Sequence, residues 1–462
     1  MQLFFLPKLL FFLLFLVGCA SAPERIASPV SDLPSAWSNS ISNSGAVKAN
    51  WLKDFNDPTL EAIVAESLEN NPNLVATAAR LNQSLSEAKI AGADRIPSIA
   101  VGLGGTRQRI SNFGPQQTGG IYYNNNNVDL NLSWEIDLWG RLYNYSSAAL
   151  AEAEASSADY AATRLSLAAQ TAKSWFNYKE AAAQEELAQS ALVNHEKNLA
   201  AIESGYKSGI RTGLELREMR TRAADAAANL SSRKRLLDQA ARRLEILLGR
   251  YPSASLAKAT DLPALPAPIP AGLPSELLLR RPDLIAAERR LVSSDQTLRA
   301  AKKDRLPKLS LTSSAGTSTS EFDDLLDSNF RVGAVAGNLI NPIFQGGRIR
   351  ANIDRRESLK EQSIANYHNT ALRAFLEVET ALAGENLLRV EARHLMLATN
   401  AAKDSLMLAR QQYQSGSLSF TNMLQSERSA LATLSRYLVA HRNLLNNRID
   451  LHLALGGSFD NE

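Results

Sequence analysis

The sequence predicts a membrane protein of mixed α/β class, in which four β-strands per chain contribute to a membrane β-barrel and long helices continue it as a tunnel. Three observations predict this fold. A stretch of alternating apolar and polar residues ends at Ile136, a helix-favouring stretch of 65 residues follows, and both patterns occur again further along the chain. Alternation at period two is typical of barrel strands. A helix of that length, about 98 Å at ~1.5 Å per residue, does not fit inside a globular domain.

The composition excludes two classes of protein. The chain has 462 residues, of which 45% are hydrophobic and 21% are charged, so it is too apolar to be disordered. Its net charge is +3. No run of Lys and Arg with interleaved aromatic residues indicates a nucleic-acid surface, so we expect no nucleic-acid partner.

The amino terminus indicates secretion and lipidation. Residues 1–18 carry one cation, Lys8, and an apolar core that is too short to span a bilayer as a mature helix, which is typical of a signal peptide. The segment ends in Leu16-Val17-Gly18-Cys19, a bacterial lipobox. We therefore expect N-acyl and S-diacylglycerol groups on Cys19, the chain's single cysteine, and no other cofactor.

The residues after Cys19 indicate where the anchor lies. Ala20 stands where an Asp would, by resemblance to the lipoprotein sorting pattern, favour retention in the inner membrane, so we expect the outer membrane. Several acyl chains together give a stable anchor. We assign residues 19–58 to a lipidated tether and belt segment, because the tether up to about Asn50 is rich in Ser, Pro and Asn.

The first predicted strands and helices form a repeat over residues 59–249. Pro97 ends its first helix because proline removes an amide and clashes with the preceding turn. The alternation that follows predicts a lipid-facing row of Val128, Leu130, Leu132, Trp134 and Ile136. In this repeat we expect helices at 73–96, 141–205 and 211–249, and strands at about 98–110 and 127–136.

A second repeat is predicted over residues 273–456. Pro72 and Pro97 are each followed 210 residues later by a matching proline, and the pairs Gly140 with Gly347 and Gly209 with Gly416 are each 207 residues apart. We expect helices at 282–306, 347–413 and 418–455, strands at about 309–318 and 330–340, a linker at 250–272 and a tail at 457–462. The third strand is mostly small or hydroxylic, so a soluble antiparallel sheet stays open as an alternative for it.

The helix lengths indicate how each repeat is assembled. In each repeat the two shorter helices, placed end to end, are about as long as the long one, roughly 94 Å in the first. We therefore expect them to pair along it and to meet partway. The Pro-rich linker and the N-terminal segment would lie there, as an equatorial belt.

Four strands cannot close a barrel, and lipid tolerates no unpaired edge, so several copies must contribute. The residues alone do not decide whether the barrel has eight, twelve or sixteen strands. Aromatic residues crowd the junction of strand and helix, as in an interfacial girdle: Trp134, Trp139, Tyr143 and Tyr145. Tyr122 and Tyr123, in the loop expected between the first two strands, would mark the other interface.

Four further motifs occur along the chain: Leu273-Pro274-Ser275-Glu276-Leu277-Leu278-Leu279-Arg280-Arg281-Pro282-Asp283, Asp137-Leu138-Trp139-Gly140-Arg141, Tyr413-x-x-Gly416 and Ala454-Leu455-Gly456-Gly457. On these motifs the chain resembles, from Trp51 to Phe459, the TolC-like outer-membrane factors, and among them the lipidated NodT-type efflux lipoproteins. The resemblance implies a homotrimer with a twelve-stranded outer-membrane β-barrel, a periplasmic α-helical barrel and an equatorial belt. It also implies docking to a periplasmic adaptor and an inner-membrane RND-type pump.

No catalytic constellation is present: the five His residues are scattered on predicted helices without zinc-binding spacing, so we expect no enzyme. The candidate aperture is the far end of the long helices, with Glu215, Tyr413, Asn422 and Gln425. By resemblance, the family carries carboxylates near the last two positions, which are neutral here and leave Glu215 as the nearest acid. Capping or solvation of a helix end is the alternative role for these residues.

The sequence therefore predicts the passive exit duct of a tripartite efflux system for drugs or other small toxic solutes. Two alternatives stay open: the exit duct of a type I protein secretion system, and a structural periplasmic coiled-coil lipoprotein. The strand Val128–Ile136 argues against the second, because a spacer has no use for a lipid-facing row. The exported substrate is not evident from the sequence.

Overall fold

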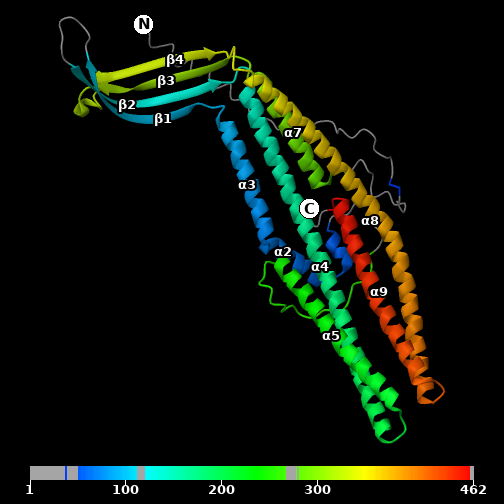
Figure 1. The fold of residues 1–462 in the computed structure, drawn as a ribbon. Coiled ribbons are helices and arrows are strands. Elements are labelled where there is room, and N and C mark those ends of the chain that lie inside the picture. Colours follow the sequence, from blue (N-terminus) through cyan, green and yellow to red (C-terminus); the bar gives the residue numbers. More distant parts are fainter. Residues whose placement is uncertain (1–36, 39–49, 112–119, 267–276, 278–279, 458–462) are drawn as a thin grey trace. The chain divides into compact units, whose positions relative to one another are not determined.

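The computed structural model describes residues 37–38, 50–111, 120–266, 277 and 280–457. The predicted signal peptide, Cys19 and nearly all of the tether and tail lie outside these residues. The order helix, strand, strand, long helix, helix occurs twice along the chain (Figure 1). Among the described helices, none combines the length and apolar character needed to cross a bilayer.

The chain divides into two compact units, and each takes residues from both halves of the sequence. The first contains Arg80–Ser157 and Ala286–His368. The second contains the described parts of Val30–Ala79, Ala158–Ile285 and Asn369–Glu462.

The first unit holds one antiparallel sheet of four strands in the order β1-β2-β3-β4 (Figure 1). The strands are β1 (Ser98–Ser111), β2 (Gly120–Ile136), β3 (Lys308–Thr319) and β4 (Arg331–Ile340). Two short 3₁₀ turns, η3 (Phe322–Asp324) and η4 (Ser328–Phe330), separate β3 from β4.

Strand β2 begins at Gly120, seven residues before the predicted start. The expectation that Tyr122 and Tyr123 lie in a loop is wrong: they pair with Arg109 and Gln108 of β1. The run of Asn residues that follows them has low intrinsic strand preference, and pairing with neighbouring strands overrides it. The same reason explains β3, which pairs with β2 on one side and with β4 on the other despite its small residues.

The helices extend through most of the remaining chain. Their bounds are α2 (Pro58–Asn70), α3 (Pro72–Ala93), α4 (Arg141–Lys207), α5 (Gly213–Leu247), α7 (Pro282–Lys303), α8 (Arg348–Gln414) and α9 (Phe420–Ala454), with the 3₁₀ helix η2 at Trp51–Phe55. Helix α3 ends three residues before the predicted Ile96, and a turn leads from it to Pro97.

Helix α2 was not predicted as a separate helix. Asp57 caps it, because its carboxylate accepts hydrogen bonds from the backbone N–H groups of Thr59 and Leu60, both at 3.1 Å. Pro58 occupies the first helical position, where its missing N–H costs nothing. These two residues are a readable helix start that lies before the first predicted helix.

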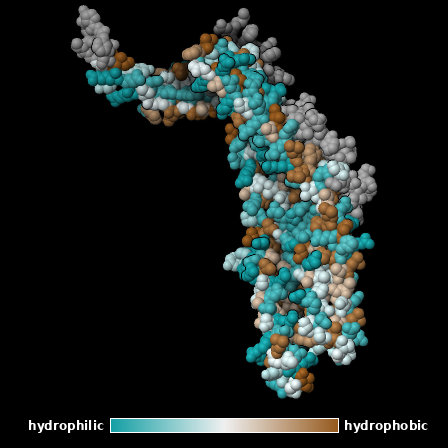
Figure 2. Space-filling model, turned by 45° about the vertical axis from the view of Figure 1, so that its right-hand side comes forward, coloured by the Kyte–Doolittle hydropathy of each residue, from teal (hydrophilic) through white to brown (hydrophobic). Residues whose placement is uncertain are grey.

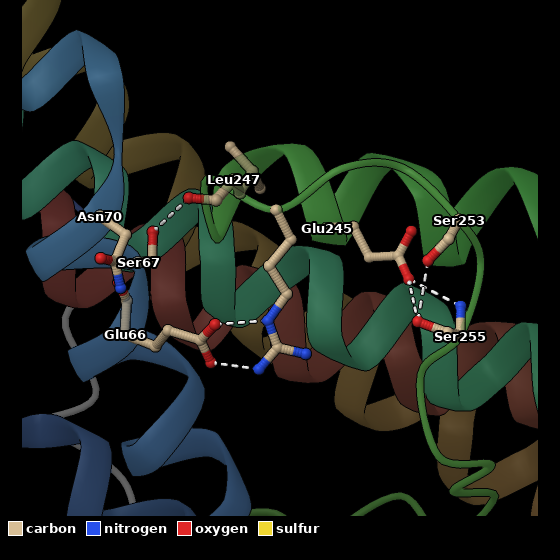
Figure 3. A network of polar contacts seen from close by, with 8 residues as sticks. Glu66, Ser67, Asn70, Glu245, Leu247, Ser253 and Ser255 are labelled. Carbon is tan, nitrogen blue, oxygen red and sulfur yellow. Dashed lines mark hydrogen bonds and ion pairs between the residues drawn. The ribbon is translucent and has the colours of Figure 1, made fainter.

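Helices α5 and α9 each end at a joint, which here means that side chains near the start of another helix bind the last carbonyl group of the helix. The carbonyl of Leu247, the last residue of α5, accepts hydrogen bonds from Ser67 Oγ and Asn71 Nδ2, both at 2.9 Å (Figure 3 shows the Ser67 bond). The carbonyl of Ala454, the last residue of α9 and 207 positions later, accepts one from Arg281 Nη1 at 3.2 Å. Because the last carbonyls of a helix have no partner within it, these side chains satisfy groups that would otherwise be orphaned.

The described part of the linker, residues 250–266, packs within the second unit. Glu245 of α5 accepts hydrogen bonds from the backbone N–H groups of Ala254 and Ser255, both at 2.7 Å (Figure 3 shows the Ser255 bond). His441 of α9 lies 2.8 Å through Nε2 from the carbonyl of Pro263. Burial lowers the pKa of His441, so its ring is neutral at pH 7 and donates Nε2–H to this carbonyl.

The core of the second unit joins the N-terminal elements to three long helices. Trp51 and Phe55 of η2 pack with Phe176 of α4, Leu244 of α5 and Ile449 of α9. Trp51 also stacks on His452 at a ring distance of 5.3 Å. Burial lowers the pKa of His452 to about 3, so it acts as a neutral aromatic ring in this core.

A buried ion pair links two helices of the same unit. Arg448 of α9 is fully buried and donates hydrogen bonds to both carboxylate oxygens of Glu385 of α8 and to the carbonyl of Pro266. Arg389 adds a hydrogen bond to Glu385 at 2.6 Å from a more exposed position. Burial opposes ionisation of Glu385, but the hydrogen bonds and charges of the two arginines outweigh it and lower its pKa.

We predict that Glu385→Ala destabilises the folded protein by about 3–5 kcal/mol, because it leaves the Arg448 charge buried without its carboxylate. The matched variant Arg389→Ala removes an exposed partner and should cost about 1 kcal/mol or less. Chemical denaturation followed by circular dichroism measures both. Equal midpoints for the two variants would contradict the prediction.

The same pair predicts a pH dependence. Since the pKa of folded Glu385 is lowered, its contribution is fully present above the ordinary Glu value of 4.5. It is lost as the pH falls through the lowered pKa. The difference in midpoint between wild type and Glu385→Ala should therefore shrink below pH 4.5 and not above it.

Candidate functional site

The strand register places the predicted lipid-facing row on one face of the sheet. Val128, Leu130 and Leu132 lie opposite apolar residues of β1. On β3, Leu130, Trp134 and Ile136 lie opposite apolar residues, whereas Val128 and Leu132 lie opposite Thr317 and Ser313. On the same face lie Ile99, Val101, Leu103, Leu309, Leu311, Ala315, Val335 and Leu339. Figure 2 shows teal polar residues along one side of the sheet and tan or brown residues along the other. All five predicted residues, Val128, Leu130, Leu132, Trp134 and Ile136, therefore share one apolar face.

The other face is polar along β2 and β3, whereas β4 contributes apolar residues such as Val332 and Ile340 to it. It carries Asn125, Asn127, Asp129, Asn131 and Ser133 of β2, and it meets Ser310, Thr312 and Ser314 on β3. A sheet with one apolar and one polar face suits the boundary between lipid and an aqueous lumen.

Each end of the apolar face is marked by aromatic rings next to polar groups. At one end the guanidinium of Arg107 lies 5.0 Å from the ring centre of Tyr122, and that of Arg109 lies 5.7 Å away. At the other end Trp134 donates its Nε1–H to the carbonyl of Arg95 at 3.0 Å. Trp139 donates to the carbonyl of Pro307 at 2.7 Å. Such amphipathic pairs are typical of the two membrane interfaces.

The strands β1 and β4 are the edges of this sheet. In the described part of the chain, β1 pairs with β2 alone and β4 pairs with β3 alone. Each edge therefore presents a row of backbone N–H and C=O groups that no described strand pairs.

The predicted aperture residues lie at two turns of the second unit, between α4 and α5 and between α8 and α9. Gly209 and Gly416 have φ values of 74° and 76°, and the N–H of each donates to the carbonyl of the tyrosine three residues before it. A positive φ favours glycine, which explains these residues at the two helix ends.

Glu215 forms part of a capping box. The side chain of Thr212 accepts from the N–H of Glu215 at 3.2 Å, and the Glu215 carboxylate accepts from the N–H of Thr212 at 2.8 Å. This backbone hydrogen bond from Thr212 lowers the pKa of Glu215, with a smaller contribution from Arg211. The capping role left open from the sequence is therefore one that Glu215 performs.

The second turn also has a capping residue, Ser419, but Asn422 occupies the position that corresponds to Glu215. Ser419 Oγ accepts from the N–H of Asn422 at 3.3 Å, as Thr212 does for Glu215. Asn422 and Gln425 are exposed. Their neutral side chains lie one turn apart near the start of α9.

Arg211 brings the two turns together, and sequence analysis did not single it out. Its Nη2 donates to the Tyr413 hydroxyl at 2.8 Å, its Nη1 lies 3.4 Å from Glu215, and its charge lies 5.6 Å from the Tyr413 ring centre. Below it, Met219 and Leu216 of α5 pack with Met423 and Leu424 of α9. Tyr413 and Glu215 are thus joined through one guanidinium, while Asn422 and Gln425 are not part of this contact.

Each of the two helical hairpins has an ion pair at the equivalent position near its turn. The acidic residue is on the long helix in the first hairpin and on the shorter helix in the second. Glu203 of α4 pairs with Arg220 of α5 at 2.9 Å, and Arg410 of α8 pairs with Glu427 of α9 at 3.1 Å. The two members of each pair are separated by 17 residues.

Comparison with known proteins gives a consistent family match. The family profile described as "Outer membrane efflux protein" matches residues 63–250 and 273–457. The chain is 32% identical to outer membrane protein OprJ of Pseudomonas aeruginosa, over 96% of this chain and 94% of that protein. It is 31% identical to the cation efflux system protein CusC of Escherichia coli K12, over 96% and 97%.

Solved structures agree over nearly the whole chain. The open state of the MtrE outer membrane channel of Neisseria gonorrhoeae has 30% identity and a TM-score of 0.83, covering 96% of this chain and 99% of that one. The CmeC outer membrane channel of Campylobacter jejuni has 25% identity and a TM-score of 0.88, covering 95% of both.

We predict that Arg211→Ala loosens both turns, because Arg211 is bonded in one turn and donates to Tyr413 in the other. Hydrogen exchange of backbone amides should become faster at 206–213 and at 413–419. In the control Arg220→Ala, which removes an exposed pair within the first hairpin, only that hairpin should change. Faster exchange confined to the first turn in Arg211→Ala would contradict the link.

Proposed function

Because this chain belongs to the outer membrane efflux protein family, we propose that three copies form one duct that carries small toxic solutes across the outer membrane. The general function follows from the family: the chain is an outer-membrane efflux channel that extends into the periplasm. The number of copies, the partners and the cargo belong to the proposal.

The observation that carries the duct is the sheet with one apolar face and two unpaired edges. In hydrocarbon each unpaired backbone group costs several kcal/mol, so the edges must find partners in other copies. Three copies would give the twelve-stranded barrel that the family resemblance implies. Its lumen would be lined by the polar face.

The tandem repeat and the belt are part of the same proposal. The repeat is supported by the doubled order of elements and by the joints at Leu247 and Ala454. The belt is supported by the contacts of η2 and of residues 254–265 with α4, α5 and α9. Residues that lie on the outside of the helices there would face a periplasmic adaptor, through which an inner-membrane RND-type pump delivers cargo.

The cargo class is taken from relatives of similar identity. One relative is named for toluene efflux and another for cation efflux. The name of a third, OprJ, gives no cargo. We propose that the pump selects the cargo and that this duct passes small organic solutes or cations.

Deletion of the chain in its own organism tests the function. Accumulation of a fluorescent efflux dye should rise, and expression of the intact chain should restore the low level. Equal accumulation with and without the chain would show that it serves no small-solute efflux.

The lipid anchor on Cys19 is proposed from the lipobox alone. Mass spectrometry of the mature N-terminus should find acylated Cys19 after removal of residues 1–18. An N-terminus that begins elsewhere, or an unmodified Cys19, would remove the anchor from the proposal.

We predict that Leu132→Arg, on the apolar face between the middle of β2 and Trp134, destabilises the assembled barrel by about 1–3 kcal/mol per chain, because the cost of a lipid-facing charge falls from the midplane towards the interface. The control is Ser133→Arg, which adds the same charge at the next residue, on the polar face. Heat resistance of the oligomer on a denaturing gel measures the difference. Loss of resistance in both variants alike would contradict the assignment of the two faces.

The aperture is proposed at the turns, with Glu215, Tyr413, Asn422 and Gln425 near the narrowest part. A ring of Glu215 would attract cations, although Arg211 at 3.4 Å offsets part of its charge.

We predict that Glu215→Gln lowers the preference for potassium over chloride in planar-bilayer recordings and that Asn422→Asp raises it. The effect should be larger at 0.01 M salt, where the Debye length is about 30 Å, than at 0.1 M, where it is about 10 Å. Reversal potentials that do not change in either variant would place both residues outside the pore.

A further inference from the structure

The polar face of the sheet carries one acidic side chain away from the strand ends, Asp129 in β2. In the strands as described, the only other acid is Glu135, at the end of β2. Glu135 is neutralised by Arg141, whose Nη2 lies 2.7 Å away. Asp129 forms no ion pair with any described residue, so no charge among the described residues compensates its own.

Two amides hold the Asp129 carboxylate in place. Asn127 Nδ2 donates to one of its oxygens and Asn131 Nδ2 donates to the other. The three residues are spaced by two, so they lie on one face of the strand. An ionised carboxylate is an acceptor only, which matches its two amide donors.

Each neighbouring strand has a glycine beside Asp129. The register places Gly102 of β1 and Gly316 of β3 opposite Asp129. A Cβ atom at Gly102 would lie only 2.9 Å from Asp129 Oδ2, so a larger residue there would push against the carboxylate. Gly102 therefore leaves the Asp129 carboxylate unobstructed, and Gly316 allows the backbones of β2 and β3 to approach closely.

The position of Asp129 along β2 places it deep in the membrane segment. It lies about midway between Tyr122 and Trp134, whose polar contacts mark the two ends of the apolar face. Its neighbours Val128 and Leu130 belong to the apolar face. A charge at this depth is costly unless it faces water, so it indicates a function in the aqueous pathway.

We propose that Asp129 selects for cationic solutes inside the membrane segment, with one carboxylate from each copy forming an acidic ring in the lumen. The inference rests on the proposed duct, because only a closed barrel turns the polar face into a lumen. A ring of carboxylates attracts hydrated cations and repels anions. This filter would act independently of the helical turns, where Glu215 is paired with Arg211.

The first test is the reversal potential of reconstituted protein in a potassium chloride gradient. Asp129→Asn should shift it towards zero, and more strongly at low salt. The control Asp323→Asn removes the same charge from an exposed residue of η3, outside the strands, and should leave it unchanged. An unchanged potential in Asp129→Asn, or an equal shift in the control, would overturn the inference.

The second test needs no open aperture. Intact cells that make Asp129→Cys or Leu130→Cys are treated with a membrane-impermeant anionic methanethiosulfonate, and modification is measured as a mass shift. We expect Asp129→Cys to react and Leu130→Cys, on the apolar face, to be protected. The unsubstituted chain, whose single cysteine is Cys19, is the reagent control.

The outcomes separate the two proposals. Modification of Leu130→Cys in place of Asp129→Cys would reverse the faces and refute the duct together with the ring. Modification of Asp129→Cys, with a reversal potential that Asp129→Asn does not shift, would leave the duct intact and refute the selective role of Asp129.

Discussion

Backbone groups at the edges of the sheet constrain the rest of this molecule. Strands β1 and β4 each present one row of N–H and C=O groups that no described strand pairs. Water could satisfy these groups, but hydrocarbon cannot. In the proposed duct, the apolar face that includes Leu309 and Ile136 contacts lipid, so the edges of the sheet must pair with neighbouring copies. The fold of one chain would then be complete only as part of an assembly.

In the second unit, unpaired backbone groups also occur at the helix ends, where side chains bind them. The last carbonyl of α5 is bound by Ser67 and Asn71, and the last carbonyl of α9 by Arg281. Asn71 and Arg281 each precede a proline that starts the next helix, and proline itself has no N–H to offer. An amide and a guanidinium thus do the same work in the two halves, which explains why the joint persists although the residue differs.

The fold could be predicted where the pattern was local. Val128 to Ile136 alternate at period two, and Pro97, Pro282 and Gly209 mark ends of elements through their own backbone preferences. Tyr122 was misplaced because the Asn residues after it resemble a loop, and only pairing with β1 reveals a strand. Asp57 and Pro58 are a local sign of α2, because an aspartate followed by a proline is a typical helix start.

The candidate sites were less predictable because their contacts are distant in sequence. Glu215 could be identified as an acid near a turn, but the link from Arg211 to Tyr413 joins residues 202 positions apart. Arg448 and Glu385 are likewise 63 positions apart, and the sequence around neither residue predicts their contact. The face on which Asp129 lies follows from alternation, whereas the glycines that flank it follow only from the register.

The exchanged charges of the two hairpins have a consequence for folding fidelity. If α4 paired with α9 in place of α5, Glu203 would face Glu427, and Arg220 would be left to face Arg410. Each wrong pairing would oppose like charges, and Glu427, only 4% exposed, would lie where water screens little of the repulsion. The two hairpins are similar in length and turn geometry, and the reversed order of these charges distinguishes them. This arrangement of charges therefore favours the pairing of α4 with α5 and of α8 with α9 over the exchanged pairing.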